Sequence, residues 1–213
     1  MRTIIVANAK GGCGKTTIAT GLASYYATFR NKNVVLADLD PQRSSLDWLS
    51  DRPKDRAVIT PHRPDQGPVR KSPNIDVVIY DAPARSHGVE LSHLVRRGET
   101  LLIPVLPSPL DMRAARNFLE ELYALKTVRD GHIAVGIVAN RVREHTRIYQ
   151  DLAFALGRIK IPFVGALRDS MNYITAARRG LGILELAPSA VERDWQQWRK
   201  MLRWLNSKRA LGR

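Results

Sequence analysis

Residues 8–17 read NAKGGCGKTT, and this stretch decides the fold of the chain. It lies between an apolar, β-branched run at Thr3–Ala7 and a helix-like stretch at Thr16–Phe29, the strand–loop–helix setting of a phosphate-binding loop. Glycines let backbone N–H groups curl around phosphate oxygens, and the dipole of the following helix favours an anion at the same point. A glycine-rich turn with a chance Lys-Thr is the alternative, and the flanking strand and helix count against it.

The side chains of this loop carry specific expectations. Lys15 supplies a cation for the β and γ phosphates, and the Thr16 hydroxyl supplies a ligand for Mg²⁺. The sequence therefore predicts that ATP and Mg²⁺ bind in a cradle completed by Gly11, Gly12, Cys13, Gly14 and Thr17. Cys13 is interpreted as a small side chain that fits a tight turn, in preference to a redox switch.

Apolar runs alternate with helix-like stretches along the rest of the chain, which predicts an α/β fold with a doubly wound, mostly parallel sheet in one domain over residues 1–213. The further strands are expected at Asn33–Ala37, Ala57–Thr60, Ile75–Tyr80, Thr100–Val105, Ile133–Ala139 and Phe163–Ala166. The further helices are expected at Leu110–Thr127, Arg147–Leu156, Asn172–Arg179 and Val191–Leu205. Ser50–Ser72 is rich in Pro, Arg and Asp and is interpreted as a surface connection around the short strand.

Carboxylates follow two of the predicted strands. Asp38 and Asp40 lie two residues apart in the segment DLDPQ, so they would share one face if the strand continued. Asp81 ends the apolar run 75–81, the layout of a Walker B strand, and is expected to hold Mg²⁺ opposite Thr16. Ligands of such sheets bind outside the carboxyl ends of the strands, so these acids and the glycine loop are expected to meet.

The composition indicates which classes of binding partner the protein is expected to have. The 213 residues include 34 Lys+Arg and 20 Asp+Glu, a formal net charge of +14, which favours a polyanionic partner, nucleic acid before an anionic membrane. No apolar stretch approaches the length of a membrane span or a signal peptide, so a cytoplasmic protein is expected. The single cysteine excludes an intramolecular disulfide and cannot hold an iron–sulfur cluster alone.

The form KGGCGKTT, with Lys10 directly before paired glycines, resembles the deviant Walker A motif of the ParA/MinD family of ATPases. In that family the extra lysine reaches the phosphates of a partner subunit, so the resemblance implies an ATP-dependent homodimer in which Lys10, Lys15 and Asp40 are the catalytic residues. It implies that Asp40 positions the attacking water and that Asp38, with Thr16 and Asp81, supports the Mg²⁺ shell. It also implies slow hydrolysis until an adaptor protein stimulates it.

The resemblance extends nearly along the whole chain. DAP at 81–83, the segment IPVLPSPLD at 103–111 and the LRD segment around Arg168 are similar to family positions, and the pair Asn140-Arg141 looks like the family's base-contacting position. Asn140 and Arg168 are expected to bind the nucleotide. The chain is most similar to the small ParA proteins without an N-terminal helix-turn-helix domain, because the glycine loop begins within ten residues of Met1.

Basic residues gather late in the chain. ParA-like ATPases bind DNA without sequence preference as ATP dimers, and the resemblance together with the net charge assigns that role to six candidates: Arg178, Arg179, Arg199, Lys200, Arg203 and Lys208. The last predicted helix has Trp195, Trp198, Leu202 and Leu205 on one stripe. That stripe is expected to pack on the sheet, and the alternative is an amphipathic anchor on a membrane.

Three functions are compatible with these motifs. The favoured one is a nucleoid-associated ATPase that segregates or positions a cargo, whether a plasmid, a chromosome region or a protein compartment. The alternative is a MinD-like membrane switch, which would share the whole ATP site. A metabolic relative such as a cobyrinate amidase or dethiobiotin synthase would need a further substrate site, and a nitrogenase-like iron protein is excluded by the lone Cys13.

Overall fold

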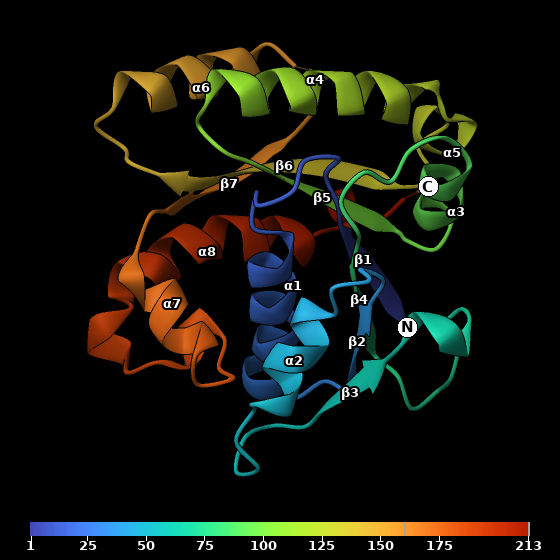
Figure 1. Ribbon diagram of the computed structural model, residues 1–213, viewed down its shortest axis with the longest axis vertical. Helices are drawn as coiled ribbons and strands as arrows, with labels where there is room; N and C mark the ends of the chain where they lie inside the picture. The colour runs from blue at the N-terminus through green and yellow to red at the C-terminus, as the bar shows by residue number, and fades with distance from the viewer. Residues whose placement is uncertain (160, 213) are drawn as a thin grey trace.

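A computed structural model describes residues 1–159 and 161–212. Within these residues one sheet of seven strands has the order β3-β2-β4-β1-β5-β6-β7, and every neighbouring pair is parallel (Figure 1). The predicted doubly wound α/β fold is confirmed, and its sheet is parallel throughout. The strands are β1 (Arg2–Val6), β2 (Val34–Asp38), β3 (Ile59–His62), β4 (Val77–Asp81), β5 (Thr100–Val105), β6 (Ala134–Val142) and β7 (Phe163–Arg168).

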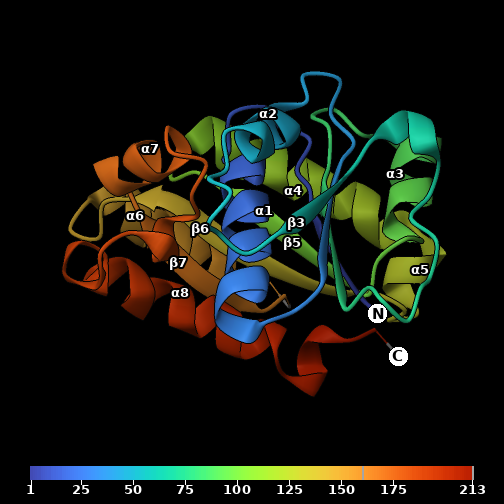
Figure 2. The same cartoon turned by 90° about the horizontal axis from the view of Figure 1, so that it is seen from below.

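Helices cover both faces of this sheet (Figure 1). One face carries α3 (Gly88–Val95), α4 (Pro109–Ala124), α5 (Lys126–Arg129) and α6 (Arg147–Gly157). The other face carries α1 (Lys15–Ser24), α2 (Ser44–Ser50), α7 (Met171–Ala177) and α8 (Glu192–Leu205). Seen from below, α8 follows the β7 edge of the sheet and lies beside α1 (Figure 2).

Two hydrophobic cores follow from the alternation of side chains along each strand. In β1, Ile4 and Val6 face the core under α1 and α8, whereas Ile5 faces the core under α3 and α4. Many side chains in both cores are fully buried. The apolar strands are therefore covered on both faces, as a parallel sheet requires. Trp198 of α8 packs tightly against Gly21 of α1, where an added Cβ would lie 2.5 Å from the indole ring.

The predicted elements agree with the structure except in a few places. Two short helices, α2 and α3, were not predicted, and α1 passes into a π-helical turn at Tyr25–Phe29. Helix α4 is capped by the Ser108 hydroxyl, which accepts the backbone N–H of Asp111 at 3.1 Å. Helix α8 begins at Glu192, one residue after the expected start at Val191, and its N-cap makes no side-chain hydrogen bond.

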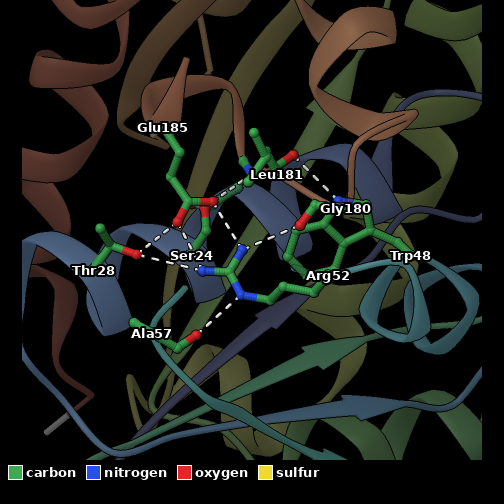
Figure 3. Close-up of polar contacts among 10 residues, drawn as sticks. Ser24, Thr28, Trp48, Arg52, Ala57, Gly180, Leu181 and Glu185 are labelled. Carbon is green, nitrogen blue, oxygen red and sulfur yellow. Dashed lines mark hydrogen bonds and ion pairs between the residues drawn. The ribbon is translucent and has the colours of Figure 1, made fainter. Parts of the chain in front are cut away.

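A buried ion pair ties the surface connection to the C-terminal third (Figure 3). The Arg52 guanidinium donates to both carboxylate oxygens of Glu185 at 2.7 and 2.9 Å, and the two side chains are 5% and 0% exposed. Arg52 also donates to the carbonyl of Ala57, and Glu185 accepts from the Thr28 hydroxyl at 2.7 Å. The connection after α2 is therefore anchored at its first residues.

Candidate functional site

The glycine loop lies at the carboxyl edge of the sheet, between β1 and α1, as predicted. Gly14 caps α1 with φ +94°, a left-handed conformation that favours glycine. Its Cα also faces the Asn140 amide so closely that an added Cβ would lie 2.1 Å from Nδ2. The same Nδ2 donates to the carbonyl of Cys13 at 2.8 Å, so the end of β6 holds the loop in place.

Both lysines of the loop are paired within the chain. Lys15 is 7% exposed, and its ammonium donates to the carbonyl of Lys10 at 3.2 Å, across the mouth of the loop. The Lys10 ammonium lies 2.6 Å from a carboxylate oxygen of Asp111. Burial raises the pKa of the Cys13 thiol, which disfavours the thiolate and agrees with a packing role for that side chain.

Asp111 is a site residue that the sequence did not single out as a partner of Lys10. It lies in the first turn of α4, is 4% exposed, and accepts a hydrogen bond from the Ser108 hydroxyl. One of its carboxylate oxygens has no hydrogen-bond partner among the described residues. The contact with Lys10 spans 101 positions of the chain, so no local signal could have revealed it.

Asp81 ends β4 with its carboxylate directed into the protein. Neither of its oxygens has a hydrogen-bond partner in the part of the chain that the structure describes, and the residue is 1% exposed. Burial raises the pKa of Asp81 to about 7, and the neighbouring Thr16 and Lys15 oppose that rise. A buried carboxylate that lacks donors is suited to a divalent cation, so Asp81 and Thr16 fit the expected Mg²⁺.

Asp38 lies opposite Asp81 in the pairing of β2 with β4, but its oxygens are fully used. They accept the backbone N–H groups of Asp40, Ser45 and Leu46 and the Ser45 hydroxyl, at 2.7–3.2 Å. Asp38 thereby caps α2 and orients the turn that presents Asp40. This arrangement fits the expected support of a Mg²⁺ shell better than direct ligation.

The loop and Asp40 open onto one cleft of about 480 Å³, whereas Asp38 and Asp81 are buried beneath the surface. Its lining includes Lys15, Thr16 and Asp40, so residues predicted from three separate segments meet there. Among the described residues no cluster of three or more His, Cys, Asp or Glu side chains is placed to hold a metal ion, so a cation here would draw ligands from a nucleotide and water.

A second cavity of about 390 Å³ lies beside the phosphate cleft and contains the residues expected to bind the rest of the nucleotide. Thr17, Asn140 and Arg168 line it. Arg168 is already paired, because its guanidinium donates to both oxygens of the buried Asp194, at 2.8 and 2.9 Å. The cavity is therefore linked to α8 through this ion pair, because Asp194 lies in the first turn of that helix.

The six candidate DNA contacts are all exposed. They lie on elements that extend from one edge of the sheet to the other, and we call this set of residues the band. Arg178 lines the second cavity at the carboxyl edge of the sheet. Lys208 precedes Ala210, whose carbonyl accepts from Thr100 at the amino end of β5, the opposite edge. Arg199, Lys200 and Arg203 lie on α8, which runs between these two edges, and Arg179 adjoins Arg178.

The stripe on α8 packs as expected. Trp198, Leu202 and Leu205 are buried in the core under α1, and Trp195 is half-buried. None of the helices among residues 1–159 and 161–212 is long and apolar enough to cross a membrane. A larger cavity of about 800 Å³ lies between α4 and α6, away from the glycine loop.

The chain matches a known family of nucleotide-binding proteins. The carboxysome distribution protein A of Halothiobacillus neapolitanus is 28% identical over 191 residues, which cover 86% of this chain and 87% of that protein. The structure of apo McdA from Cyanthece superposes with a TM-score of 0.73 at 16% identity, over 95% of this chain and 99% of that one. The septum site-determining protein MinD of Pyrococcus horikoshii, solved with Mg-ADP, superposes with a TM-score of 0.71 at 13% identity, over 97% and 96% of the two chains. The model of the CobQ/CobB/MinD/ParA nucleotide binding domain matches residues 4–183, and the chain belongs to this family.

Proposed function

We propose that the protein is an ATPase that dimerises on ATP, binds DNA without sequence preference and positions a cargo together with an adaptor protein. The observation that carries the proposal is that the glycine loop contributes two lysines: Lys15 lines the phosphate cleft, and its ammonium donates to the backbone carbonyl of Lys10. One lysine neutralises the phosphates of the bound nucleotide. The side chain of Lys10 is 36% exposed, and its ammonium pairs with Asp111 among the described residues. Lys10 is therefore available to a second nucleotide.

The chemistry assigned to the cleft follows from its side chains. Lys15 and the loop N–H groups bind the β and γ phosphates, and Asp40 orients the attacking water. Thr16 and Asp81 would hold Mg²⁺, with Asp38 steadying the shell, and this ion would neutralise charge that develops on the phosphates. Hydrolysis is slow in the isolated protein because Lys10 has to leave Asp111 before it can act in a dimer.

The band along α7, α8 and the 3₁₀ turn at Lys208–Ala210 supports DNA as the polyanion. Contacts to phosphates need only exposed cations, and a dimer doubles their number, so ATP-driven dimerisation switches binding on. The burial of the α8 stripe argues against the MinD-like alternative, because the apolar face that a membrane would need is already used in the core.

The curated relative from Halothiobacillus maintains the distribution of carboxysomes, as its name says. That relative supports a cargo that is a protein compartment, placed along the nucleoid by an ATPase and its adaptor. The Soj protein of Thermus thermophilus, a chromosome-partitioning ATPase by name, is 50% identical over 52 residues, and it supports a chromosome region as the alternative cargo.

The test is binding to a duplex of unrelated sequence with ATP, ADP or no nucleotide, at two salt concentrations. We expect binding with ATP only, lost in Lys15→Ala. Replacing Arg199 and Arg203 by Ala should weaken binding about tenfold or more and lower the salt slope by about 2, since each phosphate contact contributes about 1. The matched control is Arg113→Ala with Arg116→Ala, which changes the charge equally on α4, across the sheet. Equal loss in both pairs, or binding without ATP, would contradict the proposal.

A further inference from the structure

The cavity of about 800 Å³ between α4 and α6 is a groove that the nucleotide site does not use. The two helices run side by side on the face of the sheet opposite α1 and α8 (Figure 1). Apolar side chains of the core under α4 form much of its lining, among them Leu119, Leu152 and Ile161. A mostly apolar hollow of this size is typical of a binding site.

Two aromatic side chains border this groove and remain exposed. Phe154 of α6 is 69% exposed, and Tyr123 of α4 is 42% exposed. The Arg158 guanidinium lies over the Phe154 ring, with its central carbon 5.7 Å from the ring centroid. Large apolar side chains beside an apolar groove form a continuous patch, and such a patch marks a surface that a partner covers.

The charged side chains of the groove have no ionic partner within the described part of the chain. Five of them line it: Arg113, Arg116, Glu120, Asp151 and Arg158. None of these five makes an ion pair among the described residues. Arg113 and Arg116 lie one turn apart in the first half of α4, so this end of the groove is suited to acidic side chains of an occupant.

These features together favour one kind of occupant. A second copy of this chain is disfavoured, because the net charge of +14 would bring further cations to the arginines. DNA would pair with the arginines but would leave the apolar lining and Phe154 uncovered. A helix with an apolar stripe and acidic flanks satisfies both parts of the groove. We propose that the groove between α4 and α6 binds such an acidic amphipathic helix of a partner protein.

The groove is also next to the turn that restrains Lys10. Pro109 and Met112, in the first turn of α4, line the groove. Asp111 lies between them in the sequence and pairs with Lys10 at 2.6 Å. A helix seated in the groove would therefore contact the turn that holds this lysine. The identification of the partner with the adaptor rests on the proposed function, whereas the groove and its occupant do not.

The probe for this proposal is a fluorescein-labelled synthetic peptide as long as α4, which has 16 residues. It carries Leu on one helical face and Glu, Gln and Ala elsewhere. Of two comparison peptides, one has the same residues in an order that disperses Leu around the helix, and the other has Lys in place of Glu. Fluorescence anisotropy follows binding to the full chain. We expect the acidic amphipathic peptide to bind at least about tenfold more tightly than either comparison peptide.

Phe154→Ala tests the apolar part of the groove. The side chain is mostly exposed, so a thermal melt should change little, whereas peptide binding should weaken about fivefold or more. Val89→Ala is the matched control, because Val89 is 71% exposed on α3 and does not line the groove. Its peptide binding should stay within about twofold of the wild type.

Arg113→Ala with Arg116→Ala tests the charged part. This pair should weaken peptide binding at least about threefold, and the loss should shrink at high salt. The matched control is Arg199→Ala with Arg203→Ala, which removes the same charge on the other face of the sheet and should stay within about twofold. ATP-dependent DNA binding, measured on the same proteins, should show the opposite pattern for the two pairs.

Several results would overturn the inference: no peptide binding, equal binding of all three peptides, equal loss in both arginine pairs, or equal loss in Phe154→Ala and Val89→Ala. Release of the bound peptide by duplex DNA without nucleotide would make the groove a nucleic-acid site instead. A nucleotide-free dimer that Phe154→Ala dissociates would make a second copy the occupant. If the peptide binds as expected but the wild type binds no DNA with ATP, the proposed function fails and the groove stands.

Discussion

Replacing Asp81 by Asn should stabilise the protein in the absence of metal while abolishing its function. The Asp81 carboxylate is 1% exposed and has no hydrogen-bond donor among the described residues, and burial raises its pKa from 3.8 to about 7. Between these values the folded state holds a proton that the unfolded state has lost, so stability falls as the pH rises from about 4 to 7. The difference between these two pKa values corresponds to a loss of about 4 kcal/mol in the free energy of unfolding above pH 7.

The assay is urea unfolding of the wild type and Asp81→Asn, in EDTA and without nucleotide, at pH 5 and pH 8. At pH 5 the folded wild type still holds the proton that its unfolded chain has lost, so the variant should be more stable by only about 2 kcal/mol. At pH 8 the variant should be more stable by about 4 kcal/mol. With Mg²⁺ and ATP the order should reverse, because only the wild type gains binding energy. A variant that is less stable than the wild type at pH 8 in EDTA would refute the reasoning.

Two further substitutions test contacts that bridge distant segments. Glu185→Gln should lower the free energy of unfolding by about 3–5 kcal/mol, because it leaves Arg52 buried without its counter-charge; urea unfolding measures this, and a loss below about 1 kcal/mol would contradict a buried pair. The hydrogen bonds from Arg52 hold the pKa of Glu185 below its usual range against the effect of burial, so this stabilisation should be lost as the pH falls below about 4. Asp111→Asn should release Lys10 and lower the protein concentration needed for the ATP dimer by up to about fivefold, since the pair is partly exposed and contributes about 1 kcal/mol. Light scattering across a dilution series checks this, and weaker dimerisation in the variant would count against the restraint.

The sequence was sufficient for the elements whose signals are local. Six of the seven strands are apolar runs of ordinary length, and the glycine loop indicates the strand before it and the helix after it. These signals predicted the fold and the meeting of Lys15, Thr16 and Asp40 at one cleft. The short edge strand β3 was also found, inside the connection rich in Pro and Arg.

The elements that sequence reasoning missed depend on contacts between distant residues. The N-cap residue of helix α2 makes no capping hydrogen bond with its side chain. The backbone N–H groups of Ser45 and Leu46 donate instead to Asp38, a residue of β2. The first residue of α3 is likewise held from outside, since Glu121 of α4 accepts the N–H of Gly88 at 2.7 Å. Helix starts that borrow their caps from other elements show no local signature.

The same reason limited the description of the site. The pairing of Lys10 with Asp111 and that of Arg168 with Asp194 each join separate elements, and the second occupies a side chain that was expected to be free for the nucleotide.

The most direct test of the account is the molar mass of the protein in solution with ATP, with ADP and without nucleotide. Asp40→Ala should be used beside the wild type, because blocked hydrolysis lets the ATP state accumulate. We expect a dimer with ATP only, and a monomer under every condition in Lys10→Ala and Lys15→Ala. The same mass in all nucleotide states, with ATP bound, would contradict an ATP-driven switch.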